Sequence, residues 1–327
     1  MESRKYKKGD VIFKEGEIGS CMYEIISGSV EIIAEKGTEY EKKLTELKAG
    51  AFFGEMAVIE SSTRSATAVA LEDTEVEVIL GSSVSDYLKR KPERIIEIMR
   101  SVSGRIRALT QDYMDVCRTI NESNGNRGRI KQSDGLWSRL KAFAGIYSRK
   151  GKSVTPAERD EKRVKHADGL GKNVLYYDKR DIIFEESEES GCMFDILGGE
   201  VGIYSAYGTP DEKLLVKLGA DTFFGEMGML DNEPRSATAV ALEYDTYVER
   251  IYPEDLGEIF ERRPMKILMI MQHLSARLRK LTLDYLEACK TASEIIDAEE
   301  NGGGLSADAE ERIKMLCSIS IYGRYYT

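Results

Sequence analysis

Two hydrophobic patterns alternate along the chain, and each occurs twice. Short apolar stretches broken by glycine and charge run from Gly9 to Glu31 and again from Arg180 to Gly202. This rhythm is typical of short antiparallel strands joined by tight turns. Further along each copy, apolar residues recur at alternating spacings of four and three, which predicts a long helix with a heptad seam. The pattern therefore indicates two copies of one unit, with strands first and a long helix last.

The seam of each expected helix continues for about eight turns, which is longer than packing on one small β-domain explains. In the first copy the seam comprises Ile95, Met99, Val102, Ile106, Leu109, Tyr113, Val116 and Ile120. In the second copy it comprises Ile267, Met271, Leu274, Leu278, Leu281, Tyr285, Ala288 and Ala292. Three arrangements remain open: the helices pair within one chain as a pseudo-dimer, they pair between chains as a homodimer, or each packs on its own domain.

The two copies match most closely between the strands and the helix. Residues 52–72 read FFGEMAVIESSTRSATAVALE and residues 223–243 read FFGEMGMLDNEPRSATAVALE, with 14 of 21 positions identical and no gap. A match of this length inside one chain indicates a duplication. In each copy a glycine permits a sharp backbone turn, and the residues after it can form one helical turn whose free N–H groups suit an anion. An arginine nine residues after the glutamate offers a fork suited to a phosphate.

These two segments resemble the phosphate-binding cassette of the cyclic nucleotide-binding domain family, and we call them the first and second cassettes. The family includes the catabolite activator proteins and the regulatory subunits of cyclic-AMP-dependent protein kinase. The resemblance implies a fold that is mainly β with α: two eight-stranded β-rolls (jelly rolls), each followed by a long C-terminal helix. The second cassette has Pro234 before its arginine, as the family usually does, whereas Thr63 in the first resembles cyclic-GMP-dependent kinases.

The resemblance also implies a role for each matched residue. The glutamates would bind the ribose 2′-hydroxyl, the arginines the cyclic phosphate, and the serines the phosphate or a guanine edge. A threonine on each long helix would face the purine. In the first copy the expected ligand-binding residues are Gly54, Glu55, Met56, Arg64, Ser65 and Thr110. In the second copy they are Gly225, Glu226, Met227, Arg235, Ser236 and Thr282.

The second copy departs from the first in a turn before the cassette. Gly16 is replaced by Ser187, and the glycine that follows is moved to Gly191. A displaced turn there would alter the rim of the second pocket. The turn between two later strands places a glycine at Gly28 in the first copy, matched by Gly198 or Gly199 in the second.

Composition narrows the functional classes. The 327 residues carry a net charge of −10, which disfavours general binding to nucleic acid. The polar N-terminus and the lack of an apolar run near 18 residues predict a cytoplasmic chain without a signal peptide or transmembrane segment. The five cysteines form no C-x-x-C motif, so we expect free thiols. The two histidines have no metal-ligand spacing, and no nucleophile–base set is present. We therefore expect no catalytic residue, metal or cofactor, and no enzyme activity.

The expected domains are residues 1–122 and 174–300, each a binding domain with its long helix. Between them lies a basic linker, residues 123–173, with 13 Lys or Arg against 5 Asp or Glu. Within it, Leu136, Trp137, Leu140, Phe143, Ala144 and Tyr147 share one helical face. Such a helix suits a membrane surface or a partner groove, or it packs on the acidic domains of its own chain. Residues 301–327 form a tail broken at Asn301 to Gly304, with a short helix from Leu305 to about Ile319 capped by Ser306 or Asp308.

The sequence favours a receptor for cyclic AMP or cyclic GMP that regulates an unidentified effector protein. Ligand binding would rearrange the two domains and their long helices. The alternative is an interaction scaffold in which one or both pockets are vestigial and the heptad helices assemble subunits. The absence of a helix-turn-helix pattern after either long helix disfavours a transcription factor. The sequence does not choose between the two nucleotides.

Overall fold

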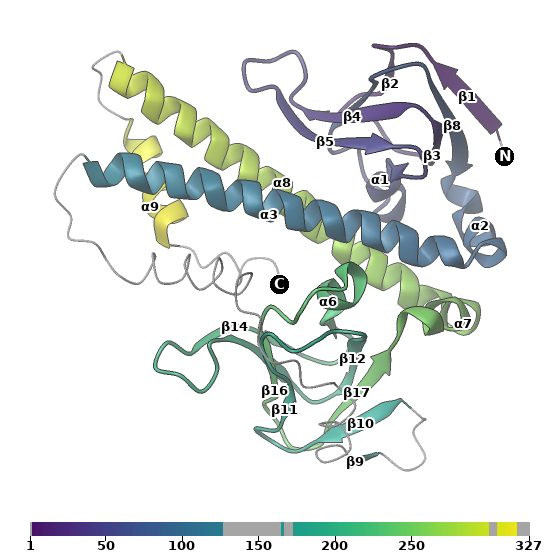
Figure 1. The fold of residues 1–327 in the computed structure, drawn as a ribbon, viewed down its shortest axis with the longest axis vertical. Coiled ribbons are helices and arrows are strands. Elements are labelled where there is room, and N and C mark those ends of the chain that lie inside the picture. Colours follow the sequence, from purple (N-terminus) through teal and green to yellow (C-terminus); the bar gives the residue numbers. More distant parts are fainter. Residues whose placement is uncertain (1, 127–164, 167–172, 301–305, 319–327) are drawn as a thin grey trace. The chain divides into compact units, whose positions relative to one another are not determined.

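The computed structural model describes residues 2–126, 165–166, 173–300 and 306–318 (Figure 1). Contacts divide the chain into two units, residues 1–120 with 255–317 and residues 121–254 with 318–327. The first unit thus combines the N-terminal β-roll with the long helix that follows the second β-roll in sequence. This division differs from the sequence-based domains, which keep residues 255–300 with the second roll.

The first roll is a pair of four-stranded antiparallel sheets, as the resemblance implied. One sheet has the order β1 (Glu2–Tyr6), β8 (Thr74–Leu80), β3 (Cys21–Ser27) and β6 (Phe52–Phe53). The other has the order β2 (Val11–Phe13), β7 (Thr67–Ala70), β4 (Ser29–Ala34) and β5 (Lys42–Lys48). Apolar side chains from both sheets fill the space between them, including the rings of Phe13, Tyr23 and Phe53. The Tyr23 and Phe53 rings stack with centroids 5.0 Å apart.

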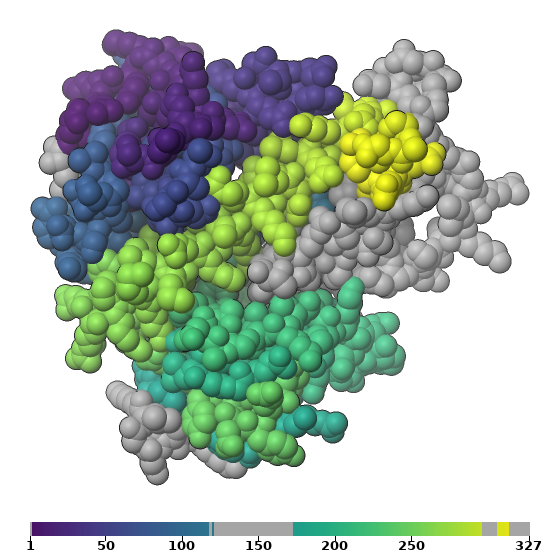
Figure 2. Space-filling model, turned by 180° about the vertical axis from the view of Figure 1, so that it is seen from behind, coloured from purple at the N-terminus to yellow at the C-terminus, as the bar shows by residue number. Residues whose placement is uncertain are grey.

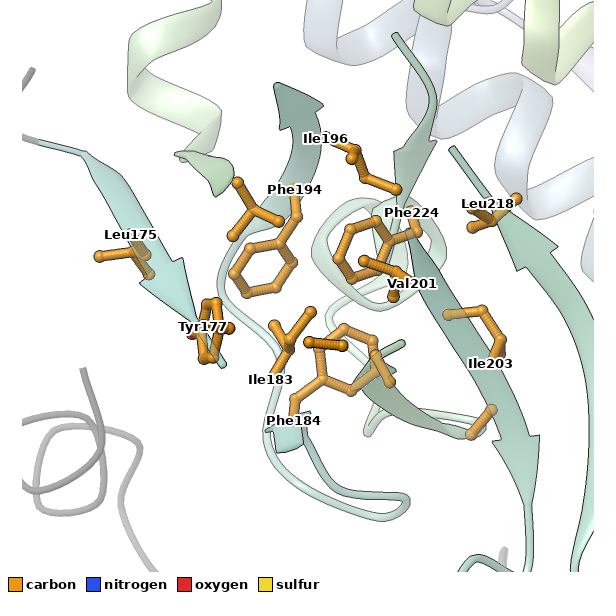
Figure 3. Close-up of a cluster of buried hydrophobic side chains, with 14 of the residues drawn as sticks. Leu175, Tyr177, Ile183, Phe184, Phe194, Ile196, Val201, Ile203, Leu218 and Phe224 are labelled. Atoms are coloured by element: carbon orange, nitrogen blue, oxygen red, sulfur yellow. The ribbon is translucent and has the colours of Figure 1, made fainter. Parts of the chain in front are cut away.

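The second roll repeats the eight strands of this arrangement and has one more strand, β9, at the edge of one sheet. One sheet has the order β15 (Phe223–Phe224), β12 (Met193–Gly198), β17 (Thr246–Ile251), β10 (Val174–Tyr177) and β9 (Lys165–His166). The other has the order β11 (Ile182–Phe184), β16 (Thr238–Ala241), β13 (Val201–Ser205) and β14 (Lys213–Leu218). Its core is drawn in Figure 3, where Phe184, Phe194 and Phe224 lie together at the centre of the buried cluster. Phe194 and Phe224 stack with centroids 5.1 Å apart, matching the ring pair of the first roll.

Glycine fixes the turn after the third strand of each roll. Gly28 has φ +86°, and a Cβ there would lie 2.5 Å from Thr74 Oγ1. Gly199 has φ +82°, and its Cβ would lie 2.5 Å from Thr246 Oγ1. Only glycine combines this left-handed backbone with so close an approach. Gly199 rather than Gly198 is therefore the equivalent of Gly28.

Each roll contains a short helix: α1 (Glu55–Ile59) lies between β6 and β7, and α6 (Glu226–Asp231) lies between β15 and β16. After the last strand of the first roll, the 3-10 turn η1 (Gly81–Ser83) and α2 (Val84–Arg90) lead to the long helix α3 (Glu93–Asn126). In the second copy η2 (Pro253–Asp255) and α7 (Leu256–Arg262) lead to α8 (Pro264–Glu300). A short helix, α9 (Ala307–Ser318), follows α8.

The heptad seams are buried along nearly their whole length. All the seam residues of α3 and α8 are less than a tenth exposed except Val116 and Ala292, which are partly buried. Ile120 of α3, Ile295 of α8 and Ile313 of α9 form one apolar cluster, with Val116 and Ala292 packed against it. Figure 1 shows α9 beside the C-terminal parts of both long helices, and Figure 2 shows α8 lying along the first roll.

Two further helices were expected from the sequence, and one of them lies within the described residues. Helix α9 confirms the short helix expected in the tail, and Ser306 Oγ accepts a hydrogen bond from the Ala309 backbone N–H at 3.1 Å, which is the N-cap contact. The amphipathic helix expected around Trp137 lies outside the described residues. Among the helices that the structure describes, none is long and apolar enough to cross a membrane.

Candidate functional site

Each cassette begins with a glycine that brings its arginine against the backbone. Gly54 lies between β6 and α1 with φ 71°, and Gly225 takes φ 74° at the same place in the second copy. A Cβ on Gly54 would lie 2.6 Å from Arg64 Nη1, and one on Gly225 would lie 2.5 Å from Arg235 Nη1. Both the left-handed turn and the close approach therefore require glycine.

Arg64 is a buried cation held by neutral groups. It is 5% exposed, and its Nη1 and Nη2 donate to the carbonyls of Gly54 at 2.6 Å and Cys21 at 2.7 Å. Its guanidinium also lies 4.2 Å from the centroid of the Phe13 ring. Within the part of the chain that the structure describes, no carboxylate lies within ion-pair distance of Arg64. A buried positive charge without such a partner is suited to an anionic ligand.

Glu55, the first residue of α1, is fully buried. Its Oε1 accepts a hydrogen bond from Arg105 Nη2 on α3, which forms an ion pair. Its Oε2 has no hydrogen-bond partner among the described residues. Because an unsatisfied buried carboxylate oxygen is costly, this atom is suited to accept a hydrogen bond from a ligand hydroxyl.

Glu55 and Arg64 border one cavity of about 260 Å³. This volume is near the lower limit, roughly 300 Å³, of typical small-molecule sites. Strand β5 contributes Leu44 and Thr45 to the wall, and α3 contributes a face that includes Gly104 and Arg105. The cavity thus has a buried cation and a buried carboxylate with an unused oxygen, and apolar surface between them.

Helix α8 of the second repeat also lines this first cavity, through Leu278 and Thr282. Thr282 is 6% exposed, and its hydroxyl donates to the Leu278 carbonyl at 2.8 Å. With its proton engaged in this way, the Thr282 oxygen presents lone pairs to other groups. The equivalent residue of α3, Thr110, does not line the cavity and donates to the Ile106 carbonyl at 2.7 Å.

The second cassette repeats the arginine geometry around a much smaller space. Arg235 is 4% exposed and donates to the carbonyls of Gly225 and Cys192, both at 2.7 Å. Burial lowers the pKa of the Arg235 guanidinium from its usual value, because the charged form loses hydration. The cavity beside it is about 20 Å³, which is room for about one water molecule.

The expected change in the turn before the second cassette is smaller than the sequence suggested. Ser187 keeps the left-handed backbone of Gly16, with φ 69° against 81°. Its N–H donates to the Arg235 carbonyl at 2.8 Å, as that of Gly16 donates to Arg64 at 2.9 Å. The turn is therefore conserved between the copies even though the glycine is not.

The two copies differ just beyond that turn, where a glycine and a larger residue that touch each other have exchanged positions. In the first copy a Cβ added to Gly19 would lie 2.3 Å from the Ala57 Cβ. In the second copy the same two positions are Ser190 and Gly228, and a Cβ on Gly228 would lie 2.4 Å from Ser190 Oγ. Each copy thus has one glycine in the pair, at the first position in one copy (Gly19) and at the second position in the other (Gly228). Ser190 Oγ is buried and has no hydrogen-bond partner among the described residues.

The structure brings the sequence-predicted cassette residues together in two groups, and both threonines lie elsewhere than expected. Gly54, Glu55, Met56, Arg64 and Ser65 line the first cavity, and Gly225, Glu226, Met227, Arg235 and Ser236 line the second. Thr282, expected at the second site, lines the first cavity, and Thr110 lines neither.

Sequence reasoning missed the cavity residues outside the cassettes. These are chiefly Leu44, Thr45, Gly104, Arg105 and Leu278. Arg105 and Arg277 occupy equivalent positions in the two repeats, which is a signal that could have identified Arg105. Among the described residues, no group of His, Cys, Asp and Glu could hold a metal ion.

Comparison with known proteins gives matches to both repeats. The family model for the cyclic nucleotide-binding domain matches residues 3–91 and 174–263. Human cGMP-dependent protein kinase 2 is 24% identical over 246 residues, which cover 75% of this chain and 25% of the kinase. The cAMP-dependent protein kinase regulatory subunit of Debaryomyces hansenii is 26% identical over 244 residues, or 74% of this chain and 42% of the subunit.

A third relative matches one region only. A putative potassium channel protein of Rhodopseudomonas palustris is 36% identical over 105 residues, which cover 32% of this chain and 25% of the channel. The chain therefore spans less than half the length of these curated relatives. Among solved structures, cAMP bound PfPKA-R (141-441) is 22% identical, covers 94% of this chain and 82% of that one, and superposes with a TM-score of 0.33.

Proposed function

Because the chain belongs to the cyclic nucleotide-binding domain family, we propose that its first repeat binds cyclic AMP or cyclic GMP and thereby regulates a partner protein. The observation that carries this proposal is the first cavity itself, where a buried arginine and a buried glutamate with an unused oxygen border one space. A cyclic nucleotide has a phosphate anion and a ribose hydroxyl, which are the groups that such an arginine and glutamate bind.

The proposed pose follows from the chemistry of the walls. The cyclic phosphate lies between Arg64 and the N–H groups at the start of α1, and the ribose 2′-hydroxyl donates to Glu55 Oε2. The base then extends toward Leu44 and Thr45 of β5 and toward Thr282 of α8. Because the Thr282 hydroxyl already donates within its helix, it accepts rather than donates at the base. This favours the amino group of adenine over the carbonyl of guanine.

The second site is proposed to be the weaker one. Its glutamate and arginine are retained, but its cavity admits about one water molecule in this conformation. Binding there requires the walls to separate, and that rearrangement subtracts from the affinity. The second repeat then contributes chiefly through its long helix.

The regulatory step is proposed to be a shift between arrangements of the long helices. Helices α3 and α8 both contribute to the first cavity, so a ligand in it favours the arrangement in which both are close. The shared cluster at Ile120, Ile295 and Ile313 supports an intrachain pseudo-dimer of the two helices. The effector protein would sense this arrangement, and the chain itself is proposed to act as a regulator without enzyme activity.

The experiment is calorimetric titration of the ligand-stripped protein with cyclic AMP and with cyclic GMP. It compares the unaltered chain with Arg64→Ala and Arg235→Ala. Removing the arginine of a desolvated charge pair costs about 2–5 kcal/mol, so Arg64→Ala is expected to weaken the tighter site by about 30-fold or more. Arg235→Ala is the matched control, because it removes the equivalent arginine from the closed cavity and leaves the tighter site intact.

The competing function predicts a different result. If the chain is an interaction scaffold with vestigial pockets, neither nucleotide produces heat with the unaltered protein. Binding that persists unchanged in Arg64→Ala would equally exclude the first cavity as the site.

A further inference from the structure

Helix α8 is joined to the first cassette by a group of polar contacts at the end of α1. Gln272 Nε2 donates to the Ile59 carbonyl at 3.0 Å, and Ser275 Oγ donates to Glu60 Oε1. Arg279 Nε donates to Glu60 Oε2 at 2.7 Å. Both carboxylate oxygens of Glu60 are therefore engaged by one face of α8. We call the contact of Glu60 with Ser275 and Arg279 the α1–α8 contact.

Arg279 extends the α1–α8 contact along the cassette. Its Nη2 donates to Ser62 Oγ at 2.7 Å and to the Thr63 carbonyl at 3.3 Å, directly before Arg64 in the sequence. The Glu60 and Arg279 side chains are only 15% and 24% exposed. A partly buried arginine that uses its planar fork on several acceptors is geometrically specific, and a lysine cannot reproduce it.

A second contact holds α8 further along its length. Lys290 pairs with Glu35 at 2.7 Å, at the turn between β4 and β5. Strand β5 begins with Lys42, whose Nζ lies 5.7 Å from the Tyr285 ring centroid on α8. Strand β5 is also the strand that brings Leu44 and Thr45 to the cavity wall.

Of the cavity-lining residues of α8, Leu278 lies within the α1–α8 contact, between Ser275 and Arg279, and Thr282 lies between Arg279 and the second contact. We propose that Arg279 is the positioning residue that holds α8 of the second repeat against the first nucleotide site, through its contact with Glu60. This inference rests on the proposed function. It gives the second repeat a part in the affinity of the first site, through a residue that lies outside both cassettes.

Helix α1, which is five residues long, connects the ligand to the α1–α8 contact. Glu55 begins α1 and lines the cavity, and Glu60, the C-cap residue directly after α1, contacts α8. A ligand that fixes the start of so short a helix also fixes its end. Conversely, loss of Arg279 leaves Glu60 with one partner fewer and lets α8 move away from the ligand, so that the ligand escapes faster.

The test measures association and dissociation rates of a fluorescent cyclic nucleotide on the full chain by stopped flow. Arg279→Ala is expected to raise the dissociation rate about tenfold, within the five- to 150-fold range of typical couplings, and to leave the association rate within about twofold. Arg279→Lys should restore only part of the lost residence time, because it keeps the charge but not the fork. A merely structural loss would reduce the number of binding sites and leave the dissociation rate of the remaining ones unchanged.

The matched control is Arg262→Ala, which removes an exposed pairing with Glu258 on α7 and is expected to leave both rates unchanged. An unchanged dissociation rate in Arg279→Ala, with binding that still requires Arg64, would overturn this inference and keep the proposed function. An equal effect in Arg262→Ala would also overturn it. Absence of Arg64-dependent binding in the unaltered chain would overturn both.

Discussion

Gly104 lowers the stability of helix α3, and the structure gives a reason for this glycine only at the first cavity. It lies inside α3, is exposed, and lines the first cavity. A Cβ added there would meet no atom within 4 Å, so packing does not require glycine. Glycine inside a helix costs about 0.5–1 kcal/mol relative to alanine. The missing side chain therefore leaves room in the wall of the site at the expense of helix stability.

The substitution Gly104→Ala should move stability and binding in opposite directions. The free energy of unfolding is expected to rise by about 0.5–1 kcal/mol in urea titrations, since alanine is the better helix former. First-site affinity, measured by calorimetry, is expected to fall because the added methyl occupies ligand space. Ala276→Gly, at the equivalent position of α8 and outside the cavity lining, should lower stability by a similar amount and leave affinity unchanged. Unaltered affinity in Gly104→Ala would show that the ligand does not approach α3 here.

At the scale of single residues, the sequence was sufficient to identify only those site residues that lie close together along the chain. Gly54, Glu55 and Arg64 lie within eleven residues, so their spacing identified them without any knowledge of packing. Arg105 was not among the expected site residues, because the apolar spacing of a helix marks its buried face and leaves the direction of the flanking residues open. The expected base contact, Thr110, is five residues beyond Arg105 on the same helix and does not line the cavity.

At the scale of elements, α9 joins the ends of the two long helices. Ile313 is 3% exposed and shares a cluster with Ile120 and Ile295. Arg312 adds ion pairs with Glu294 of α8 and, at 2.7 Å, with Asp308 of its own helix. This end of the seam is thus built from three helices, and α9 covers apolar surface that α3 and α8 leave uncovered.

Truncating this contact should weaken the helix pair. Ile313→Ala is expected to lower the free energy of unfolding by about 2–4 kcal/mol, as for other buried isoleucines. Hydrogen exchange around Ile120 and Ile295 should accelerate in the same variant. Glu310→Ala, on the exposed face of α9, provides the control and should stay within about 0.5 kcal/mol of the parent chain. Similar losses in both variants would mean that α9 contributes only its own helical structure.

The heptad spacing predicted these elements well and their partners poorly. It gave the extent of both long helices and the burial of their seams, and the Ser306 cap was also correct. Spacing states which face of a helix is buried but not what covers that face. Whether α8 would lie on its own roll or on the first one depended on complementary side chains such as Glu60 and Arg279, 219 residues apart in sequence.

At the scale of the whole molecule, the first unit is discontinuous in sequence. It comprises residues 1–120 and 255–317, so its roll and one of its two long helices are encoded far apart. The seam of α3 is buried in the complete unit, with Leu109 6% and Tyr113 1% exposed. Removing the C-terminal segment therefore removes part of the surface that buries the first long helix.

A chain ending at residue 126 should expose this seam and associate with itself. Size-exclusion chromatography with light scattering is expected to show dimers or larger species, and a hydrophobic dye should bind with increased fluorescence. Co-expression with residues 255–318 should restore a compact one-to-one complex. A monodisperse monomer of residues 1–126 that does not bind the dye would show that α3 buries its seam on its own roll.

The discontinuity of the first unit also sets an order of events during synthesis. Residues 121–254 must be made after the first roll and before the segment that begins at Asp255. At about 5–20 residues per second, these 134 residues (254 − 120) occupy the ribosome for roughly 7–27 s. Throughout that interval the nascent chain presents an uncovered apolar helix to chaperones. A neighbouring chain on the same polysome carries an identical α8 that fits the vacant seam, so crowded translation favours exchange of this helix between chains.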